Sequence, residues 1–504
     1  MNSRRWPRAA ASWRPDGRTV APSLSVPDFS PSRDPLVSEL EQALGRDAVA
    51  ASPEHLAAYE CDGLALYKER PRVVILPRST GETARAVRIL NRAHVPIVPR
   101  GAGTGLSGGA TPVKGGALVS LARMRRVLEV DTVDRLAHVE LGLVNADLSA
   151  HTARWKLTYA PDPSSQTACT LGGNVAENSG GPHCFKHGAT TLHVLGLTVV
   201  LSSGEVVSIG GPEPDPQGYD LRTLFVGSEG TLGIATEAWL RLVPKPEVVE
   251  TYLAPFSSMD AACRAVSAVV AAGILPAALE MIDDRTIAAV EASIFAAGYP
   301  RDAAAVLLVE LDGSRAEVRR DGTRIQEICK NHGALRFESA TDEEQRKRLW
   351  KGRKGAFGAM GRIAPDLYVM DCVVPRTRLP QALAAISEIA DRLGVKCANV
   401  FHAGDGNLHP NMSYDGRNAE EVRRVLQAGE EICRACVDLG GTLSGEHGIG
   451  IEKNDFLPMV FRPAELSAFQ QVRRAFDPDG LMNPCKSLPS SMCGEIAAAA
   501  RAPK

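Results

Sequence analysis

The stretch VPRGAGTGLSGGA, residues 98–110, decides how the first half of the chain can fold. It stands at the end of a β-α-β pattern. Residues 72–77 (RVVILP) form a short apolar run typical of a buried strand, and residues 79–94 have the apolar spacing of an amphipathic helix. A second predicted strand, residues 95–99, leads directly into the glycine-rich loop.

This loop contains a formal G-x-G-x-x-G at Gly103, Gly105 and Gly108. In a Rossmann dinucleotide site a helix follows at once and binds the pyrophosphate at its N-terminus. Here Pro112 and Gly115 break any such helix, and the next predicted element is a strand. The loop can still bind an anion, because successive backbone N–H groups without Cβ atoms form a concave nest. The alternative is an ordinary tight turn.

Two more glycine-rich blocks follow, at residues 161–190 and 226–236. Their glycines allow the backbone to approach a flat ligand closely, and the asparagines of the first block offer amide donors. Three such blocks in one domain predict a large, extended ligand, for which a dinucleotide with a flat ring system is suitable.

The rest of the chain predicts an α+β protein of two domains. Short strand patterns separated by Gly and Pro continue to residue 241, and LVPKPE (242–247) is a plausible boundary. Beyond it, alternating strand and helix patterns predict an antiparallel sheet covered by helices. We therefore expect a disordered extension at 1–34, a first domain at 35–245, a second at 246–487 and a flexible tail at 488–504.

The stretch NVFHAGDGNLHPN, residues 399–411, places His402 and His409 on either side of a glycine-rich turn that can bring the two imidazoles together. Farther on, GGTLSGEHGIG contains Glu446 and His447. Two histidines and a carboxylate form a familiar divalent-metal set with open positions for water or substrate. Each histidine could instead be a buried structural residue.

Composition excludes several classes of protein. The chain has 504 residues, a formal net charge of −2 and 44% hydrophobic residues, so no nucleic-acid partner is indicated. No apolar run is long enough to cross a membrane. The eleven cysteines lack iron–sulfur spacing, and the one CxxC pair, Cys433 and Cys436, suits the apolar face of a helix. A reducing, cytoplasmic location is expected.

The three glycine-rich blocks, in this order and spacing, resemble the FAD-binding domain of the vanillyl-alcohol-oxidase (PCMH) type. The later HxGDGNxH and GEHGIG motifs resemble the branch of FAD-linked 2-hydroxy-acid dehydrogenases. The resemblance covers roughly residues 40–487. It implies a two-subdomain FAD-binding domain followed by a substrate (cap) domain, with the FAD pyrophosphate on the loop 101–109. Some relatives attach the flavin to a histidine in that loop; this chain has Thr104 there, so we expect non-covalent FAD.

The sequence and the resemblance together predict these site residues. Metal ligation is implied for His402, His409 and Glu446, with Zn or Mn as the expected ion. The FAD-binding prediction comprises Arg100, Gly101, Ala102, Gly103, Thr104, Gly105, Gly108, Gly109, Pro161, Gly172, Gly173, Asn174, Asn178, Gly180, Glu229, Gly233, Ile234 and Asn483.

Three further residues are expected to act in catalysis. His447, beside a predicted ligand, is expected to be the base that takes the hydroxyl proton while the hydride passes to flavin N5. Arg353 stands where relatives carry a carboxylate-binding arginine, whose planar fork suits a carboxylate; its alternative is the solvated face of a helix. Asn411 is expected to add hydrogen bonds to substrate or ligands.

Two departures from the family pattern bear on function. Relatives that oxidise 2-hydroxyglutarate carry a lysine near residues 368–371, where this chain has Val369 and Met370. A small substrate such as glycolate or D-lactate is therefore expected. Close relatives often read NPGK where this chain has NPCK, with Cys485 in place of glycine.

Reduced FAD must pass its electrons on, and the chain has no iron–sulfur or haem motif of its own. The resemblance implies a second flavin subunit and an iron–sulfur subunit, which would bring the complex to the inner face of the membrane. A D-lactate dehydrogenase that acts alone with a soluble or cytochrome acceptor is the alternative. Two further alternatives are a metal-dependent hydrolase and a flavin-binding scaffold subunit.

Overall fold

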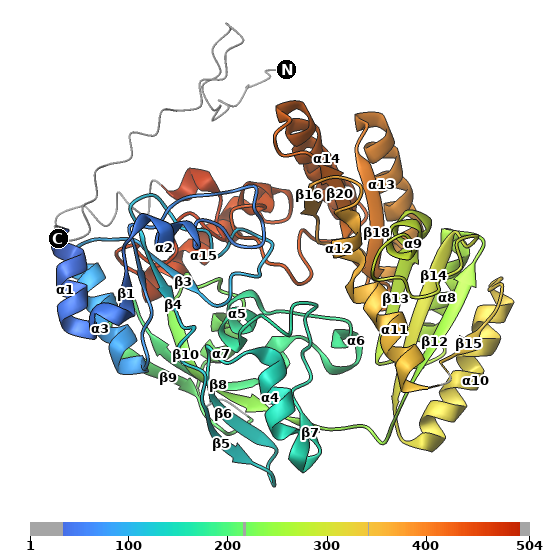
Figure 1. The fold of residues 1–504 in the computed structure, drawn as a ribbon, viewed down its shortest axis with the longest axis horizontal. Helices are drawn as coiled ribbons and strands as arrows, with labels where there is room; N and C mark the ends of the chain where they lie inside the picture. The colour runs from blue at the N-terminus through green and yellow to red at the C-terminus, as the bar shows by residue number, and fades with distance from the viewer. Residues whose placement is uncertain (1–33, 215–217, 341, 494–504) are drawn as a thin grey trace, which may run out of the picture.

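The computed structural model describes residues 34–214, 218–340 and 342–493 (Figure 1). The predicted disordered extension and most of the predicted tail lie outside these residues. The structure describes one residue of the predicted extension, Asp34, which caps the first helix. It also describes residues 488–493 of the predicted tail, in which Ser490 hydrogen-bonds to Asp455. No described helix is both long enough and apolar enough to cross a bilayer.

The glycine-rich loop leaves a small, mostly parallel sheet at the end of strand β3. Strands β2, β4 and β3 are parallel, β1 is antiparallel to β2, and the order is β1-β2-β4-β3. The predicted helix is present, and the Ser79 hydroxyl accepts the N–H of Glu82 at 3.2 Å. A strand follows the loop, as predicted, so no helix N-terminus stands there. The elements are β1 (Val49–Ala50), β2 (Val73–Ile75), β3 (Ile97–Arg100), β4 (Ala117–Ser120), α1 (Pro35–Leu44), α2 (Pro53–Ala57) and α3 (Thr80–Arg92).

A second, antiparallel sheet completes the N-terminal half (residues 34–245). Its order is β5-β6-β10-β8-β9, and its apolar side chains share one core with the first sheet and α3. Its elements are β5 (Val127–Asp131), β6 (Leu136–Glu140), β8 (Val194–Val200), β9 (Val206–Gly210), β10 (Ile234–Arg241), α4 (Asn145–Thr152), α5 (Leu171–Glu177), α6 (Cys184–His187), α7 (Leu221–Phe225) and the separate pair β7 (Leu157–Thr158) and β11 (Val243–Pro244).

The C-terminal half (residues 246–493) is built on an antiparallel sheet, as predicted. Its main path is β15-β12-β14-β13-β18-β19-β17, and β20 joins β18 to β16. These strands are β12 (Val248–Phe256), β13 (Ala278–Asp283), β14 (Ala305–Gly313), β15 (Glu338–Ser339), β16 (Asp366–Val369), β17 (Cys372–Val373), β18 (Lys396–His402), β19 (Asn407–Leu408) and β20 (Pro410–Tyr414).

Helices cover both faces of this sheet (Figure 1). Because side chains alternate along a strand, Tyr252, Ala254 and Phe256 of β12 pack into one core and Leu253 into the other. Helices α8 (Met259–Ala271), α10 (Arg315–Asn331), α13 (Leu379–Leu393) and α14 (Ala419–Asp438) cover the first face, and α9 (Asp284–Glu291), α11 (Glu343–Lys354) and α12 (Ala356–Met360) the second. The CxxC cysteines of α14 are buried in the first core, as predicted.

The end of the chain returns to the N-terminal half. After α15 (Pro463–Phe476), the returning segment (residues 477–487) runs parallel to β3: Ile97 donates to Leu481, and Asn483 donates to Ile97 at 2.7 Å. The Lys486 ammonium, almost fully buried, donates to the carbonyls of Gly109 and Thr111. Cys485 has φ +63°, a left-handed conformation that glycine adopts freely and that other residues rarely adopt.

Helix α6 projects from the N-terminal half toward the sheet of the other half, where it contacts strand β13 (Figure 1). The His183 imidazole lies 2.9 Å from an Asp162 oxygen and 3.0 Å from an oxygen of Glu310 on β14, and Lys186 pairs with Asp312. Burial alone would lower the pKa of His183, but the Asp162 and Glu310 carboxylates raise it to about 10. The two halves are therefore held together by a charged imidazolium between two carboxylates.

We predict that His183→Gln destabilises the protein most at low pH. A group whose pKa rises on folding stabilises the native state fully below its unfolded pKa, here 6.5, and loses that effect as pH rises through about 10. The loss is expected to be about 1.5–3 kcal/mol below pH 6.5, as for hydrogen bonds to charged groups. Unfolding midpoints measured across this range test the prediction. The exposed His151→Gln is the control, and a difference that does not vary with pH would contradict the assignment.

Candidate functional site

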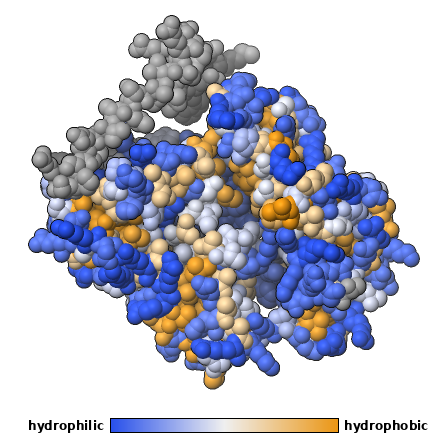
Figure 2. Space-filling model, in the orientation of Figure 1, coloured by the Kyte–Doolittle hydropathy of each residue, from blue (hydrophilic) through white to orange (hydrophobic). Residues whose placement is uncertain are grey.

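A cavity of about 460 Å³ lies between the two halves, and the surface is hollowed there on the face seen in Figure 2. Its volume is in the range of small-molecule and cofactor sites. Its walls combine the three glycine-rich blocks of the N-terminal half with side chains of the C-terminal half. The predicted cofactor and catalytic segments therefore meet in one cavity.

The first glycine-rich block packs against the second. A Cβ on Gly101 would come 2.3 Å from the hydroxyl of Thr170, which caps helix α5 by accepting the N–H of Gly173. Gly103 has φ +72°, and a Cβ there would overlap the Arg100 guanidinium. A Cβ on Gly105 would meet no atom within 4 Å. The loop thus needs glycine both for its backbone shape and for its closeness to α5, which leaves the backbone itself as the cavity wall.

Glu229 joins the third block to the C-terminal half. Its buried carboxylate accepts the N–H groups of Ile449 at 2.7 Å and Gly450 at 2.6 Å, and its carbonyl accepts the amide of Asn483 at 2.6 Å. Because Ile449 follows Glu446 and His447 so closely, this contact fixes the GEHGIG loop against the glycine-rich blocks.

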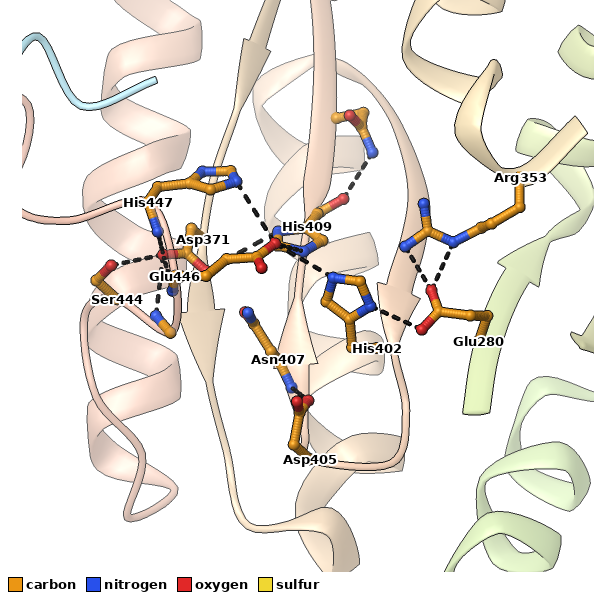
Figure 3. Close-up of polar contacts among 12 residues, drawn as sticks. Glu280, Arg353, Asp371, His402, Asp405, Asn407, His409, Ser444, Glu446 and His447 are labelled. Carbon is orange, nitrogen blue, oxygen red and sulfur yellow. Dashed lines mark hydrogen bonds and ion pairs between the residues drawn. The ribbon is translucent and has the colours of Figure 1, made fainter. Parts of the chain in front are cut away.

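His402 and His409 lie side by side, as their spacing suggested. Strand β18 ends at His402, the chain turns, and Asn407 of β19 pairs back with His402. Nε2 of His402 and Nε2 of His409 lie 3.2 and 3.0 Å from the same Glu446 oxygen, and the three ligand atoms fall within 4.8 Å of one another (Figure 3). Burial alone would raise the pKa of Glu446, but the two imidazoles hold it well below its usual value. This donor set suits a divalent cation.

His447 stacks on His409, with ring centroids 5.0 Å apart and planes within 9°. Burial lowers the pKa of His447 to about 4, against the opposing effect of Asp371. Asp371 organises the whole loop: one of its oxygens accepts the hydroxyl of Ser444 and the N–H groups of residues 445–447. Its other oxygen is 3.9 Å from Nδ1 of His409.

Arg353 lines the cavity but is not free. Its side chain is 1% exposed, which excludes a solvated helix face. Nε and Nη2 both contact one Glu280 oxygen, at 2.7 and 2.6 Å, so one edge of the guanidinium fork is already occupied. Among the described residues neither Nη1 nor Nη2 has a hydrogen-bond partner, and Nη2 contacts Glu280 only as an ion pair. Arg353 therefore offers an anion a single free nitrogen and the outer N–H of Nη2.

Most predicted site residues line the cavity. They are Arg100, Gly101, Ala102, Gly103, Thr104, Gly105, Gly109, Gly172, Gly173, Asn174, Gly180, Glu229, Gly233, Ile234, Arg353, His402, His409, Glu446 and His447.

Five others lie behind the walls, where they support backbone. The Asn411 amide donates to the carbonyl of His409 at 2.6 Å, so it braces that residue and does not face the cavity. The Pro161 carbonyl accepts a hydrogen bond from the side-chain amide of Asn145. Asn178 caps the C-terminus of α5, and its side-chain oxygen accepts a hydrogen bond from the N–H of Thr191. Gly108 has no side chain where the Ile451 side chain packs, since a Cβ there would lie 2.4 Å from it. The Asn483 side-chain amide donates hydrogen bonds to the carbonyls of Gly109 and Glu229.

Two buried carboxylates beside the cavity, Glu280 and Asp371, were not among the predicted site residues. Glu280 is 0% exposed and sits in the apolar run ALEMID, where a lone charge in a buried strand is the signal that could have revealed it. Asp371 likewise ends the apolar run YVMD. The cavity also includes Lys354, Phe357 and Leu367, which no motif indicated.

Comparison with known proteins establishes the class. A family model described as an FAD binding domain matches residues 71–210, and one described as the C-terminal domain of FAD linked oxidases matches residues 245–487. The chain belongs to the FAD-linked oxidases and is an FAD-dependent oxidoreductase. The predicted family and the prediction of FAD as a cofactor are thereby confirmed, and the hydrolase alternative is disfavoured.

Individual relatives show which enzymes of this family the chain is similar to. The chain is 46% identical to glycolate oxidase subunit GlcD of Escherichia coli K12 over 446 residues, 88% of this chain and 89% of that protein. It is 32% identical to a D-lactate dehydrogenase of Anaerostipes hadrus over 434 residues, 84% and 91% of the two chains. The solved structure of p-cresol methylhydroxylase with substrate bound has a TM-score of 0.77 at 17% identity, covering 90% and 97%, and confirms the predicted fold.

We predict that Gly101→Val weakens FAD binding. The added side chain must displace Thr170 and the start of α5, and overpacking of this kind costs about 1–3 kcal/mol, roughly 5- to 150-fold in affinity. Titration of the apoprotein with FAD, followed by flavin fluorescence, measures the change. Gly81→Ala is the control, because a Cβ on Gly81 in α3 meets only atoms at 3.9 Å. Equal FAD affinity in the Gly101 variant would contradict the role of this loop.

Proposed function

We propose that the protein oxidises a small 2-hydroxy acid, such as glycolate or D-lactate, to the 2-oxo acid. The observation that carries the proposal is the meeting of two sets of groups in one cavity. Backbone from three glycine-rich blocks forms one wall, and the imidazoles, carboxylate and guanidinium of the C-terminal half form the other. The similarity to a glycolate oxidase subunit and to a D-lactate dehydrogenase supports this substrate class.

The N-terminal wall is proposed to hold FAD without a covalent bond. Backbone N–H groups of the loop 101–109 would bind the pyrophosphate, because glycines there leave no side chains in the way. Thr104 lines the cavity, and the histidines that line it, His402, His409 and His447, all come from the opposite half. FAD, when bound, supplies the acceptor for the hydride of the substrate.

His402, His409 and Glu446 are proposed to hold a divalent metal, Zn or Mn. The fit rests on the donors: two imidazole nitrogens and a carboxylate oxygen converge, and Nδ1 of His402 is already bonded to Glu280, which leaves Nε2 for a cation. A cation at this position, when bound, supplies a Lewis acid that acidifies the substrate hydroxyl.

His447 and Arg353 are proposed to handle the substrate directly. His447 is within 3.9 Å of the Glu446 carboxylate, in the same wall, and can accept the hydroxyl proton. Nη1 of Arg353 can donate a hydrogen bond to the substrate carboxylate. Asn411 supports this wall through the carbonyl of His409.

The size of the substrate is inferred from the other side chains that line the cavity near Arg353. Phe357, Leu367 and Val369 give this part of the cavity apolar side chains, while Met370 is buried in the core behind it. Among the described residues that line the cavity beside Arg353, the cation left for a second carboxylate is Lys354, and its ammonium already lies 3.9 Å from Asp162. A short or apolar substituent on the hydroxyl carbon therefore suits the cavity better than a dicarboxylic acid.

A visible spectrum and a substrate panel test the function. We expect flavin bands that glycolate or D-lactate bleaches, weaker turnover of 2-hydroxyglutarate with a dye acceptor, and loss of activity with a chelator that Zn or Mn restores. His447→Gln is expected to lower kcat about 10²–10⁴-fold, because it removes a general base. His332→Gln, outside the cavity, is the control. Flavin bands that no 2-hydroxy acid bleaches would defeat the proposal.

Electrons are proposed to leave through a partner complex. The word subunit in the name of the GlcD relative supports a multi-subunit assembly, and we propose a second flavin subunit and an iron–sulfur subunit as the partners. The complex would work in the cytoplasm at the inner face of the membrane.

Purification from the native cell tests the partner complex. We expect the chain to co-purify with an iron–sulfur protein and to turn over faster with that protein present than with oxygen alone. Full activity on oxygen, with no associated redox protein, would contradict the complex and favour a dehydrogenase that acts alone.

A further inference from the structure

Glu280 is a fully buried carboxylate between the two functional groups of the C-terminal wall. One of its oxygens accepts Nδ1–H of His402 at 2.7 Å, and the other contacts Arg353 (Figure 3). We propose that Glu280 is a positioning residue with a double role, called here the coupling role: one oxygen orients the metal ligand His402 and the other orients the substrate-binding Arg353. The inference rests on the proposed function, since it concerns the metal and the substrate carboxylate.

The backbone dictates this contact. Strands β13 and β18 pair antiparallel over only three residue pairs, and Glu280 stands directly opposite His402 in the first of them. Directly opposed residues on one face of a sheet have Cβ atoms about 4.5–5.5 Å apart, which suits a carboxylate and an imidazole. Both side chains are buried, so solvent does not compete for the hydrogen bond.

For His402, the consequence is the choice of tautomer. A carboxylate paired with a guanidinium accepts hydrogen bonds and does not donate them. Nδ1 of His402 must therefore carry a proton, which leaves Nε2, the nitrogen 3.2 Å from Glu446, as the atom that can give its lone pair to a cation when one binds. A buried carboxylate behind a ligating imidazole also makes that imidazole a stronger ligand.

For Arg353, the consequence is orientation. Nε and Nη2 are held on the same Glu280 oxygen, which turns Nη1 away from Glu280 and leaves it without a partner among the described residues. The positive charge of Arg353 is compensated before any substrate arrives. Arg353 then recognises a substrate carboxylate through the direction of its free N–H groups more than through net charge.

A purely structural role for Glu280 makes a different prediction from the coupling role. If Glu280 served only to neutralise a buried arginine, its replacement would affect folding and Arg353 but not the affinity of the metal site. Under the coupling role, replacement also weakens the metal site through His402. Metal affinity is therefore the decisive measurement.

The experiment compares Glu280→Gln with Arg353→Met in the full-length, FAD-loaded protein. Zn²⁺ and Mn²⁺ affinities are measured by competition with a chelating dye, and KM and kcat with D-lactate. Glu280→Gln keeps the volume but cannot satisfy both partners, and we expect metal affinity to fall about 10–100-fold. Arg353→Met is expected to raise KM and to leave metal affinity within about threefold, because it does not remove the contact to His402. Should Glu280→Gln be insoluble, Glu280→Asp, one methylene too short for both contacts, takes its place.

The matched control is Asp283→Asn, a buried carboxylate on the same strand that accepts hydrogen bonds from Thr286 and Asn399 and lies outside the cavity. It is expected to leave metal affinity unchanged. A Glu280 variant that folds, retains FAD and binds metal as tightly as the wild type overturns the coupling while the proposed function stands. A wild-type protein that binds neither metal overturns the metal site of the proposed function, and the coupling with it.

Discussion

The hydrogen bonds to the Glu229 carboxylate are the constraint on which the site depends. This residue belongs to the third glycine-rich block, and its N–H donates to Ala176 at the end of α5. Its carboxylate accepts hydrogen bonds from the backbone N–H groups of Ile449 and Gly450, just after His447. Its carbonyl accepts a hydrogen bond from the side-chain amide of Asn483 in the returning segment. Glu229 has φ +52°, a conformation that a non-glycine residue keeps only where several contacts enforce it. Both walls of the cavity are therefore positioned by one buried side chain.

Buried acids control the chemistry of the C-terminal wall. Glu280 stands behind His402, and Asp371 stands behind the loop that carries Glu446 and His447. The pKa of Asp371 is held below its usual range, against the effect of its own burial, by His447, Lys453 and His409. Anions fixed in this way keep their charge without exposure to water, so the imidazoles in front of them keep a defined orientation.

Local patterns in the sequence predicted those parts of the site that are formed by residues close to one another in the chain. The glycine loops, the cap of α3 and the turn between His402 and His409 follow from neighbouring residues, and the motifs that resemble FAD-linked dehydrogenases added the predicted metal ligands. The pairing of Glu280 with His402 could not be predicted, because it depends on the register of strands that are more than a hundred residues apart. Asn411 and Asn178 were placed in the site by residue type, but their amides are used to support backbone.

The returning segment has a consequence for the order of assembly. A ribosome makes the N-terminal half first, and domains generally fold as they emerge. Here the segment that pairs with Ile97 of β3, and the Asn483 amide and Lys486 ammonium that bond to Gly109, come from residues 477–487, after the whole C-terminal sheet. The N-terminal wall of the cavity thus stays unfinished until residues 477–487 have been made, so a nascent chain completes this wall only after it has made the sheet of the C-terminal half.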